Sequence, residues 1–435
     1  MDAWLVLAIS VFGMLLLMAL GLPIAFAIAA MGIVGTIYTW GWSGLFTVAS
    51  TSFGEATTFI YVAVPLFLLM AHFLQHSGIA DDMYEIIYRW AGGIRGGLAM
   101  GTVVICAIFG AMSGISSAAT VTMGLIAFPS MMKRGYDKSM ALGCIVAGGT
   151  LGVLIPPSIM MIVYAGVSEV SVGKLFVGGI IPGIIVTLLF IAYIGIRCWI
   201  RPEMGPAVDI HYNWKEKLVS LKGVALPVIL IMLVLGTIYT GVCTPTEAAG
   251  IGALGALMCM AIYRRATYEK IKSALMFTLR TNAMVMWIII GAACFSHFFA
   301  VAGFHDQIHE AILGLGVSRW WVMILMQLLF LLLGMFLNAA AIITLLGPLF
   351  VPIIVKLGFD PLWYGILFVV NMEMGYITPP FGFNLFVLKG VLPDDVTMTD
   401  IYKSIFPFVA VMILALIIFM IFPEIITWLP NRMVN

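Results

Sequence analysis

The sequence predicts an all-α membrane protein with about ten spanning helices and two re-entrant helical hairpins, arranged as two inverted repeats. Three observations predict this class: the apolar composition, a duplicated pair of adjacent prolines, and the placement of positive charge. Of the 435 residues, 63% are hydrophobic and 9% are charged, whereas soluble domains contain about 25% charged residues. The formal net charge is +1, and the Lys and Arg residues form no basic stripe that would indicate nucleic-acid binding. We therefore expect the chain to lie in a bilayer.

Five apolar segments of the first half are long enough to cross a membrane, because a spanning helix needs about 20 apolar residues. They lie at about 4–20, 23–40, 58–75, 139–165 and 176–199. A sixth apolar stretch, 97–132, differs from these because small and hydroxyl residues fill its centre from Gly110 to Thr120. Such residues weaken a helix. We expect this stretch to be a hairpin that enters and leaves the membrane on the same side.

A proline pair occurs twice, in "GVLIPPS" from Gly152 and in "GYITPPF" from Gly375, and the two glycines are 223 positions apart. The same separation relates further pairs of identical residues, which are Pro156 and Pro379, Pro157 and Pro380, Gly124 and Gly347, Pro129 and Pro352, Gly135 and Gly358, and Asp137 and Asp360. Matches at a single offset indicate an internal duplication. We divide the chain into a first repeat (1–200), a cytoplasmic amphipathic linker (201–222) and a second repeat (223–435).

The second repeat contains the same kinds of segment as the first. Its expected spans lie at about 223–241, 246–263, 281–302, 361–389 and 404–428, with a second hairpin at about 319–355. Five spans are an odd number and a hairpin adds no crossing, so the second repeat is expected to enter the membrane from the opposite side.

The positive charges support this inverted arrangement, because cytoplasmic loops are enriched in Lys and Arg. If the flanks of the first hairpin are cytoplasmic, all but four of the 21 Lys and Arg residues lie on or near that side. The four outside are Lys174, Arg319, Lys356 and Arg432. Two further segments, "DDMYEIIYRW" from Asp81 and "HYNWKEKLVSLK" from His211, are amphipathic and are expected to lie along the membrane surface.

The proline pairs are expected to break the helices 139–165 and 361–389. A proline within a helix removes a hydrogen bond and costs about 3 kcal/mol. Broken helices and inverted repeats are typical of secondary transporters, in which unwound carbonyls bind a small cation near the middle of the membrane. Hairpin tips can bind anions through amide groups and hydroxyls. A packing kink is the alternative interpretation of each pair.

Glu373 lies inside an apolar segment, two residues before Gly375, where the second proline motif begins. A carboxyl group within the membrane is a functional candidate. Ion coupling and a structural bond to free amides of the unwound segment both remain open interpretations. The six cysteines are scattered without CxxC spacing, so the sequence predicts neither a disulfide framework nor a metal cofactor.

Three motifs together resemble a known family. "GGTLGVLIPPSIMMIVYA" from Gly148, "GVCTPTEAAGIGALGA" from Gly241 and "NMEMGYITPPFGFNLFV" from Asn371 resemble the large membrane subunit of TRAP (tripartite ATP-independent periplasmic) transporters. The likeness covers essentially the full length. One departure is Asn338 in "GMFLNAAA", where the family usually has an Asp in a G-x-x-x-D arrangement.

The resemblance implies a multi-pass symporter of the bacterial inner membrane that has no enzymatic activity and no catalytic residues. It implies a sodium-driven elevator mechanism, an organic acid substrate, a small membrane subunit of four spans and a periplasmic substrate-binding protein. The substrate is a carboxylate or a sulfonate, and the binding protein selects it.

Sodium, which the resemblance implies as the coupling ion, is expected where each hairpin tip meets a broken helix, because hard cations prefer oxygen ligands. The ligands expected at the first tip are Ser113, Ser116, Gly152, Ile155 and Pro157. Those expected at the second tip are Gly334, Gly375, Thr378 and Phe381, with Asn338 facing them. The acid is expected between the tips, against Ser117, Thr120, Asn338 and Asn384.

Three alternatives are open. A self-sufficient sodium-coupled carboxylate symporter of related fold would transport as this chain alone. A channel would show flux without saturation, although channels usually surround a symmetric pore. A membrane enzyme would need a nucleophile with a nearby base or metal ligands, and the sequence contains no such constellation.

Overall fold

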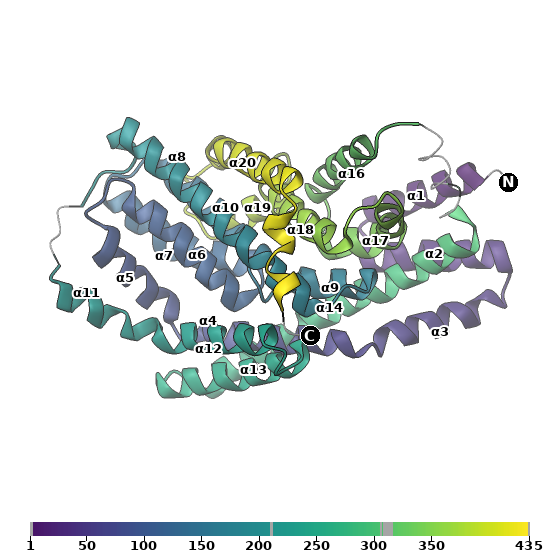
Figure 1. Cartoon of the computed structure of the whole chain (residues 1–435), viewed down its shortest axis with the longest axis horizontal. Coiled ribbons are helices and arrows are strands. Elements are labelled where there is room, and N and C mark those ends of the chain that lie inside the picture. The colour runs from purple at the N-terminus through teal and green to yellow at the C-terminus, as the bar shows by residue number, and fades with distance from the viewer. Residues whose placement is uncertain (1–2, 209–211, 305–306, 308–315, 434–435) are drawn as a thin grey trace.

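The computed structural model describes residues 3–208, 212–304, 307 and 316–433, and within these ranges the regular structure is helical. The helices of the first repeat are α1 (Ala3–Ala19), α2 (Ile24–Trp40), α3 (Gly44–Ala56), α4 (Ala63–His76), α5 (Ile79–Ala91), α6 (Gly97–Ser113), α7 (Ser116–Lys133), α8 (Lys138–Leu154), α9 (Ile159–Ser168) and α10 (Val172–Ile200). A 3-10 turn, η1 (Phe59–Val62), precedes α4. Figure 1 shows the arrangement.

The linker and the second repeat follow with similar elements. They are η2 (Pro202–Met204), α11 (Trp214–Ser220), α12 (Lys222–Tyr239), α13 (Pro245–Ile262), α14 (Tyr268–Val301), α16 (Arg319–Gly334), α17 (Ala339–Lys356), α18 (Pro361–Ile377), α19 (Phe383–Lys389), α20 (Met398–Ile421), α21 (Glu424–Thr427) and η3 (Pro430–Arg432). The expected hairpins correspond to α6–α7 and α16–α17, and the expected broken helices correspond to α8–α9 and α18–α19.

The helices form two groups that pack against each other. The frame helices are α1, α2, α4, α12, α13 and α14, in which α2 packs along α14 and α4 packs along α13. The hairpin unit consists of α6–α10 and α16–α20, in which α8 packs against both arms of the first hairpin and against α20. Within the frame, helix α14 packs against α2 and α4 and also contacts α17 of the second hairpin, so it joins the frame to the hairpin unit.

The number of spans differs from the expected ten. In the described ranges, seven helices are long and apolar enough to cross a membrane, or eight if α8 and α9 count as one bent span. Helices α1 and α2, with 17 residues each, are just too short to be counted among these spanning helices. Hairpin helix α17 is long and apolar enough to be counted among the spanning helices, although the sequence predicts that it is re-entrant.

Two other boundaries differ from the expected ones. Residues 44–56 form α3, a helix that the sequence analysis does not predict. The span expected at 281–302 begins 13 residues earlier as part of the 34-residue helix α14. The polar first turns of α14 remain helical because Glu, Lys, Leu and Arg are good helix formers and Thr267 caps the first turn.

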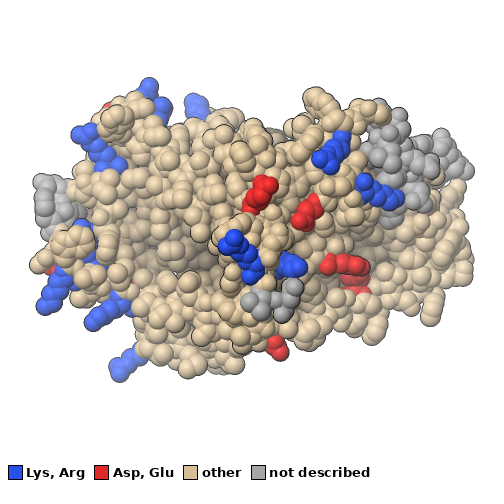
Figure 2. Space-filling view, viewed as in Figure 1, with Lys and Arg blue, Asp and Glu red and all other residues tan. Residues whose placement is uncertain are grey.

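Positive charge is concentrated at one end of the molecule. Lys and Arg side chains gather over the end formed by α5, α7, α8 and α11, on the left of Figure 2, whereas the middle of the same face carries both signs of charge. This asymmetry agrees with the expected cytoplasmic position of the first hairpin's flanks.

Candidate functional site

The tip of the first hairpin is a tight turn against the first proline break. Helix α6 ends at Ser113 and Gly114 adopts a left-handed conformation with φ +61°. A Cβ atom on Gly114 would lie 2.5 Å from the carbonyl oxygen of Pro157, so the turn needs glycine and brings that carbonyl to the hairpin tip. The Ser113 hydroxyl donates a hydrogen bond to the carbonyl of Ile115 at 3.2 Å.

The first broken helix bends by 40° between α8 and α9. The Pro156–Pro157 peptide bond is cis, and the Ser158 hydroxyl donates to the carbonyl of Val153. A Cβ atom on Gly152 would lie 3.2 Å from the Ile115 carbonyl oxygen, so α8 approaches the tip closely. The structure therefore brings Ser113, Gly152 and Pro157 together, while the side chain of Ile155 packs against Gly183 of α10.

The second tip repeats this contact. A Cβ atom on Gly375 would lie 2.9 Å from the carbonyl carbon of Gly334, and the amide of Gly382 donates to the carbonyl of Met335 at 3.2 Å. The Pro379–Pro380 bond is also cis. The Thr378 hydroxyl donates to the carbonyl of Met374 at 2.6 Å.

The Phe381 ring is exposed at this second tip. It packs against Phe336 and Phe386, with centroids 5.1 and 6.0 Å away. Phe381 can therefore offer a cation only its backbone carbonyl.

The two hairpins differ at the start of their second arms. In α17, Asn338 is the N-cap and its Oδ1 accepts from the amide of Ala340 at 2.8 Å, while the amide of Ala339 donates to the hydroxyl of Tyr376 at 3.1 Å. In α7, the N-cap is Ile115, which has no side-chain acceptor. The first amides of α7 are thus left open to a ligand, whereas those of α17 are partly satisfied by the protein.

A hydrogen bond joins the two halves of the chain at this site. The Ser116 hydroxyl at the start of α7 donates to Oδ1 of Asn384 in α19 at 3.1 Å. Asn384 is fully buried, and its Nδ2 has no hydrogen-bond partner in the described chain. The sequence analysis predicts that Ser116 binds the cation and that Asn384 binds the acid, and the structure places the two side chains in contact.

A cavity of about 170 Å³ lies between both hairpin tips and α14. Of the predicted site residues, Ser116, Ser117 and Asn338 line it. Its other lining residues are Gly114, Ile115, Val153, Ile159, Met160, Phe277, Thr281, Met284, Val285, Ile288, Tyr376 and Phe383. None of these residues is charged, so an anion in this cavity would be bound by hydroxyls, amides and helix N-termini.

Thr120 and Asn384 are not among the lining residues of this cavity. Thr120 is buried against Gly149 of α8, and its hydroxyl donates to the carbonyl of Ser116 at 3.1 Å. Sequence reasoning missed Thr281 and Tyr376. The signal in α14 is the spacing of Phe277, Thr281 and Ile288, which places them on one helical face, but an ordinary span shows the same spacing.

Glu373, which precedes the second break in α18, also lies beside the first break. The residue is fully buried in α18, both carboxyl oxygens lack a hydrogen-bond partner in the described chain, and the carboxyl group lies beside the backbone of Leu154 at the end of α8. Asn371, two residues earlier, faces away from it and donates to the carbonyl of Gln327 at 2.8 Å. The carboxyl group thus lies between α18 and the end of α8, and it has no counter-charge among the described residues.

A second, more polar cavity of about 330 Å³ lies between the frame and the hairpin unit, farther along α14. Glu55, Tyr61, Glu169, Ser296 and His297 are among its lining residues. Burial raises the pKa of Glu55, and a hydrogen bond from Tyr61 partly opposes this shift.

Two hairpin tips that meet two broken helices around a shared cavity are typical of membrane transporters. The chain matches the family model of the tripartite ATP-independent periplasmic transporter, DctM component, over residues 11–425. It therefore belongs to this family, and it is a multi-pass protein of the bacterial inner membrane that acts as a transport protein and not as an enzyme.

Individual relatives agree with this assignment. The C4-dicarboxylate TRAP transporter large permease protein DctM of Vibrio cholerae is 35% identical, with 99% of this chain and 98% of that protein aligned. The isethionate TRAP transporter permease protein DctMQ of Oleidesulfovibrio alaskensis is 31% identical over 93% of this chain and 63% of its own length.

A crystal structure shares the fold. It is that of the YdaH transporter of Alcanivorax borkumensis, with a TM-score of 0.61 and 19% identity over 89% of this chain and 90% of that chain.

Proposed function

We propose that this chain is the sodium-driven permease subunit of a tripartite uptake system for an organic acid, either a carboxylate or a sulfonate. The observation that carries the proposal is the Ser116–Asn384 hydrogen bond, because it joins the two tip regions beside one cavity. Ligand binding at one tip would thereby affect the geometry of the other.

The donor set at each tip fits a sodium ion. At the first tip the carbonyl of Pro157 lies against Gly114, beside the hydroxyl of Ser113, and at the second tip Gly375 approaches the backbone of Gly334 closely. Hydroxyl and carbonyl oxygens are the ligands that hard cations prefer. A bound cation would hold each hairpin tip onto its broken helix.

The cavity between the tips fits the carboxylate or sulfonate group of a substrate. The uncapped amides of α7, the hydroxyl of Ser117 and the hydroxyl of Thr281 are available as donors, and Nδ2 of Asn384 is a further donor beside Ser116. The relatives that carry C4-dicarboxylate and isethionate in their names support both acid classes. The cavity alone does not select between them, since it has no cationic side chain.

The partners we propose are a periplasmic substrate-binding protein and a small membrane subunit. The tripartite family assignment supports both, and the isethionate relative supports the second because it extends well beyond the region that aligns with this chain. We further propose an elevator motion in which the hairpin unit slides along the frame. Its support is α14, which borders both the uncharged cavity and, farther along the helix, the polar cavity.

Uptake into proteoliposomes tests the assembly. Vesicles that contain the chain, the small subunit and the binding protein should take up the acid that the binding protein binds, and omission of any one component should abolish uptake. Full uptake by the chain alone would contradict the tripartite proposal and favour a self-sufficient symporter.

A further inference from the structure

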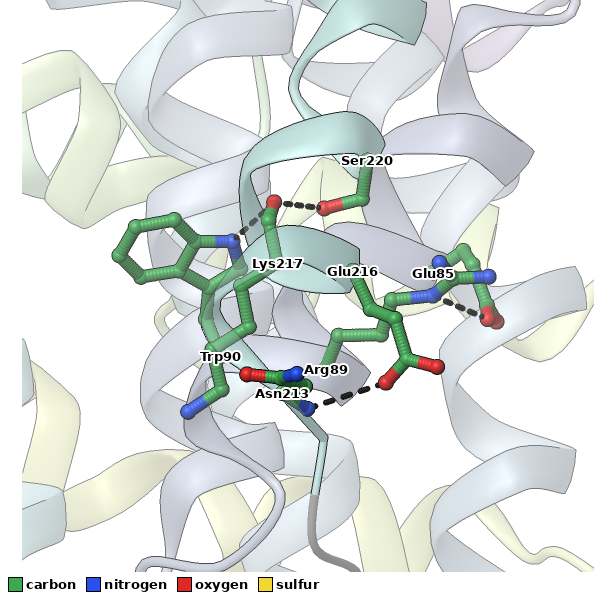
Figure 3. Close-up of polar contacts among 7 residues, drawn as sticks. All are labelled: Glu85, Arg89, Trp90, Asn213, Glu216, Lys217 and Ser220. Carbon is green, nitrogen blue, oxygen red and sulfur yellow. Dashed lines mark hydrogen bonds and ion pairs between the residues drawn. The ribbon is translucent and has the colours of Figure 1, made fainter.

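The linker helix α11 is bound to the surface helix α5 by a hydrogen bond from Trp90, and further bonds stabilise α11 internally (Figure 3). The indole Nε1 of Trp90 donates to the carbonyl of Lys217 at 3.0 Å, and the Ser220 hydroxyl donates to the same carbonyl at 2.6 Å. The amide of Asn213 donates to Glu216 at 3.0 Å as part of a capping box. A helix of seven residues is marginal in isolation, so the hydrogen bond from Trp90 and the contact between the Trp90 and Trp214 rings determine where α11 lies.

The α5–α11 surface exposes large apolar side chains. The exposed fractions are 38% for Trp90, 69% for Trp214, 57% for Leu218 and 49% for Val219. The two indole rings pack edge to face with centroids 6.2 Å apart. Tryptophan is enriched at the depth of lipid headgroups, where its ring and its N–H group meet different environments.

Basic side chains accompany these apolar residues, and the nearby acids have internal partners. Arg89 pairs with Glu85 at 2.9 Å, and one carboxyl oxygen of Glu216 accepts from the amide of Asn213 in the capping box. Lys215 and Lys217 form no ion pair in the described chain, and the ammonium of Lys217 lies 5.6 Å from the centre of the Trp214 ring. Two lysines beside exposed tryptophans therefore have positive charge available for an external anion.

We propose that the α5–α11 surface, formed by Trp90, Trp214, Lys215, Lys217 and Leu218, binds the headgroups of anionic phospholipids. The apolar side chains lie at the boundary of the acyl chains while the two lysines contact phosphate, as in amphipathic membrane-surface helices. Helix α5 connects α4 to the first hairpin and the linker connects α10 to α12, so one lipid surface anchors two connections between the hairpin unit and the frame.

Fluorescence quenching by brominated lipids tests the proposal. The full chain is placed in lipid nanodiscs with brominated phosphatidylglycerol or brominated phosphatidylcholine, and the quenching due to Trp90 and Trp214 is obtained by difference from W90F/W214F. We expect stronger quenching by phosphatidylglycerol. K215Q/K217Q should reduce the preference for phosphatidylglycerol by about fivefold or more.

The matched control is K272Q/R280Q, which removes two exposed positive charges from α14 outside this surface and should leave the preference unchanged. Equal quenching by both lipids, or an equal effect of both double variants, would overturn the proposal. Competition by inorganic phosphate would instead indicate a site for free anions. Loss of quenching on addition of the small membrane subunit would assign the surface to a protein partner, which also overturns the proposal.

Discussion

Ser116 donates a hydrogen bond to Asn384 across 268 positions of sequence, at 3.1 Å and in a buried environment. Ser116 begins the second arm of the first hairpin, and Asn384 lies in the first turn after the second proline break. Each residue belongs to a tip region in a different half of the chain. The contact makes the candidate site a product of both halves rather than of either alone.

Removal of the Ser116 hydroxyl should weaken sodium activation. We expect S116A to raise the sodium concentration for half-maximal uptake about threefold to tenfold, because the buried Asn384 side chain loses its partner. N384A should have a similar effect, and S116A/N384A should be no worse than either single variant.

The measurement is initial uptake in proteoliposomes as a function of sodium concentration. S404A is the control, since Ser404 is a buried serine whose hydroxyl donates only within its own helix, to Ile401. Additive effects of S116A and N384A would show that the two side chains act independently.

The glycine contact at the second tip should not tolerate a methyl group. In G375A the new Cβ would lie within about 3 Å of the Gly334 backbone, and such overpacking costs about 1–3 kcal/mol. We expect uptake to fall more than about tenfold while the protein still assembles, because the hairpin tip is pushed from the broken helix.

G236A provides the comparison, because a Cβ atom at Gly236 has no neighbour within 4 Å. Uptake by G236A should equal that of the original chain. Normal uptake by G375A would mean that the tip contact is not needed for transport.

The hydroxyl of Thr378 is predicted to assist cation binding. T378V should raise the sodium concentration for half-maximal uptake and leave the affinity of the binding protein for the permease unchanged, since Thr378 lies in the tip region and its hydroxyl contacts the backbone of Met374. T237V is the control, because the Thr237 hydroxyl donates within α12 to Val234. Equal sodium dependence of T378V and T237V would exclude the Thr378 hydroxyl as a ligand.

Glu373 should be neutral where it is buried, because an ionised carboxylate without a partner is very costly in an apolar environment. We therefore expect E373Q to retain sodium-driven uptake with an unchanged pH profile, and E373K to abolish uptake. The measurement is uptake by E373Q between pH 5.5 and 8.5. A folded E373Q protein without uptake would instead assign an ion-coupling role to the carboxyl group.

The hairpins and the breaks could be predicted from sequence because each has a local cause. Paired prolines end α8 and α18, and small and hydroxyl residues end α6, so the limits 97–132 and 319–355 lie close to the observed helices. The Ser116–Asn384 contact has no local cause. It depends on the packing of α7 against α19, which a single sequence does not reveal.

The role of α14 in lining the cavity could not be predicted from the sequence, for a different reason. Phe277 and Thr281 lie next to charged residues such as Arg280, which lowers the apparent hydropathy, so the expected span began only at 281. The helix nevertheless continues from Tyr268 and one face of it borders the cavity. Asn338 also has a role that its sequence position does not indicate, since its side chain caps α17.

The inverted arrangement predicts opposite labelling of two exposed lysine positions. A cysteine at Lys133, after the first hairpin, should react only from the cytoplasm, and one at Lys356, after the second hairpin, only from outside. The measurement is labelling with a membrane-impermeant thiol reagent on whole cells and on inside-out vesicles. Labelling of both positions from the same side would contradict the inverted repeat.

The most direct test of the central claim is the dependence of uptake on the sodium gradient in proteoliposomes that contain all three components. Sodium binding at two coupled tips predicts uptake that requires an inward sodium gradient and rises with a Hill coefficient above about one. Uptake that proceeds without sodium and follows a proton gradient would contradict the account.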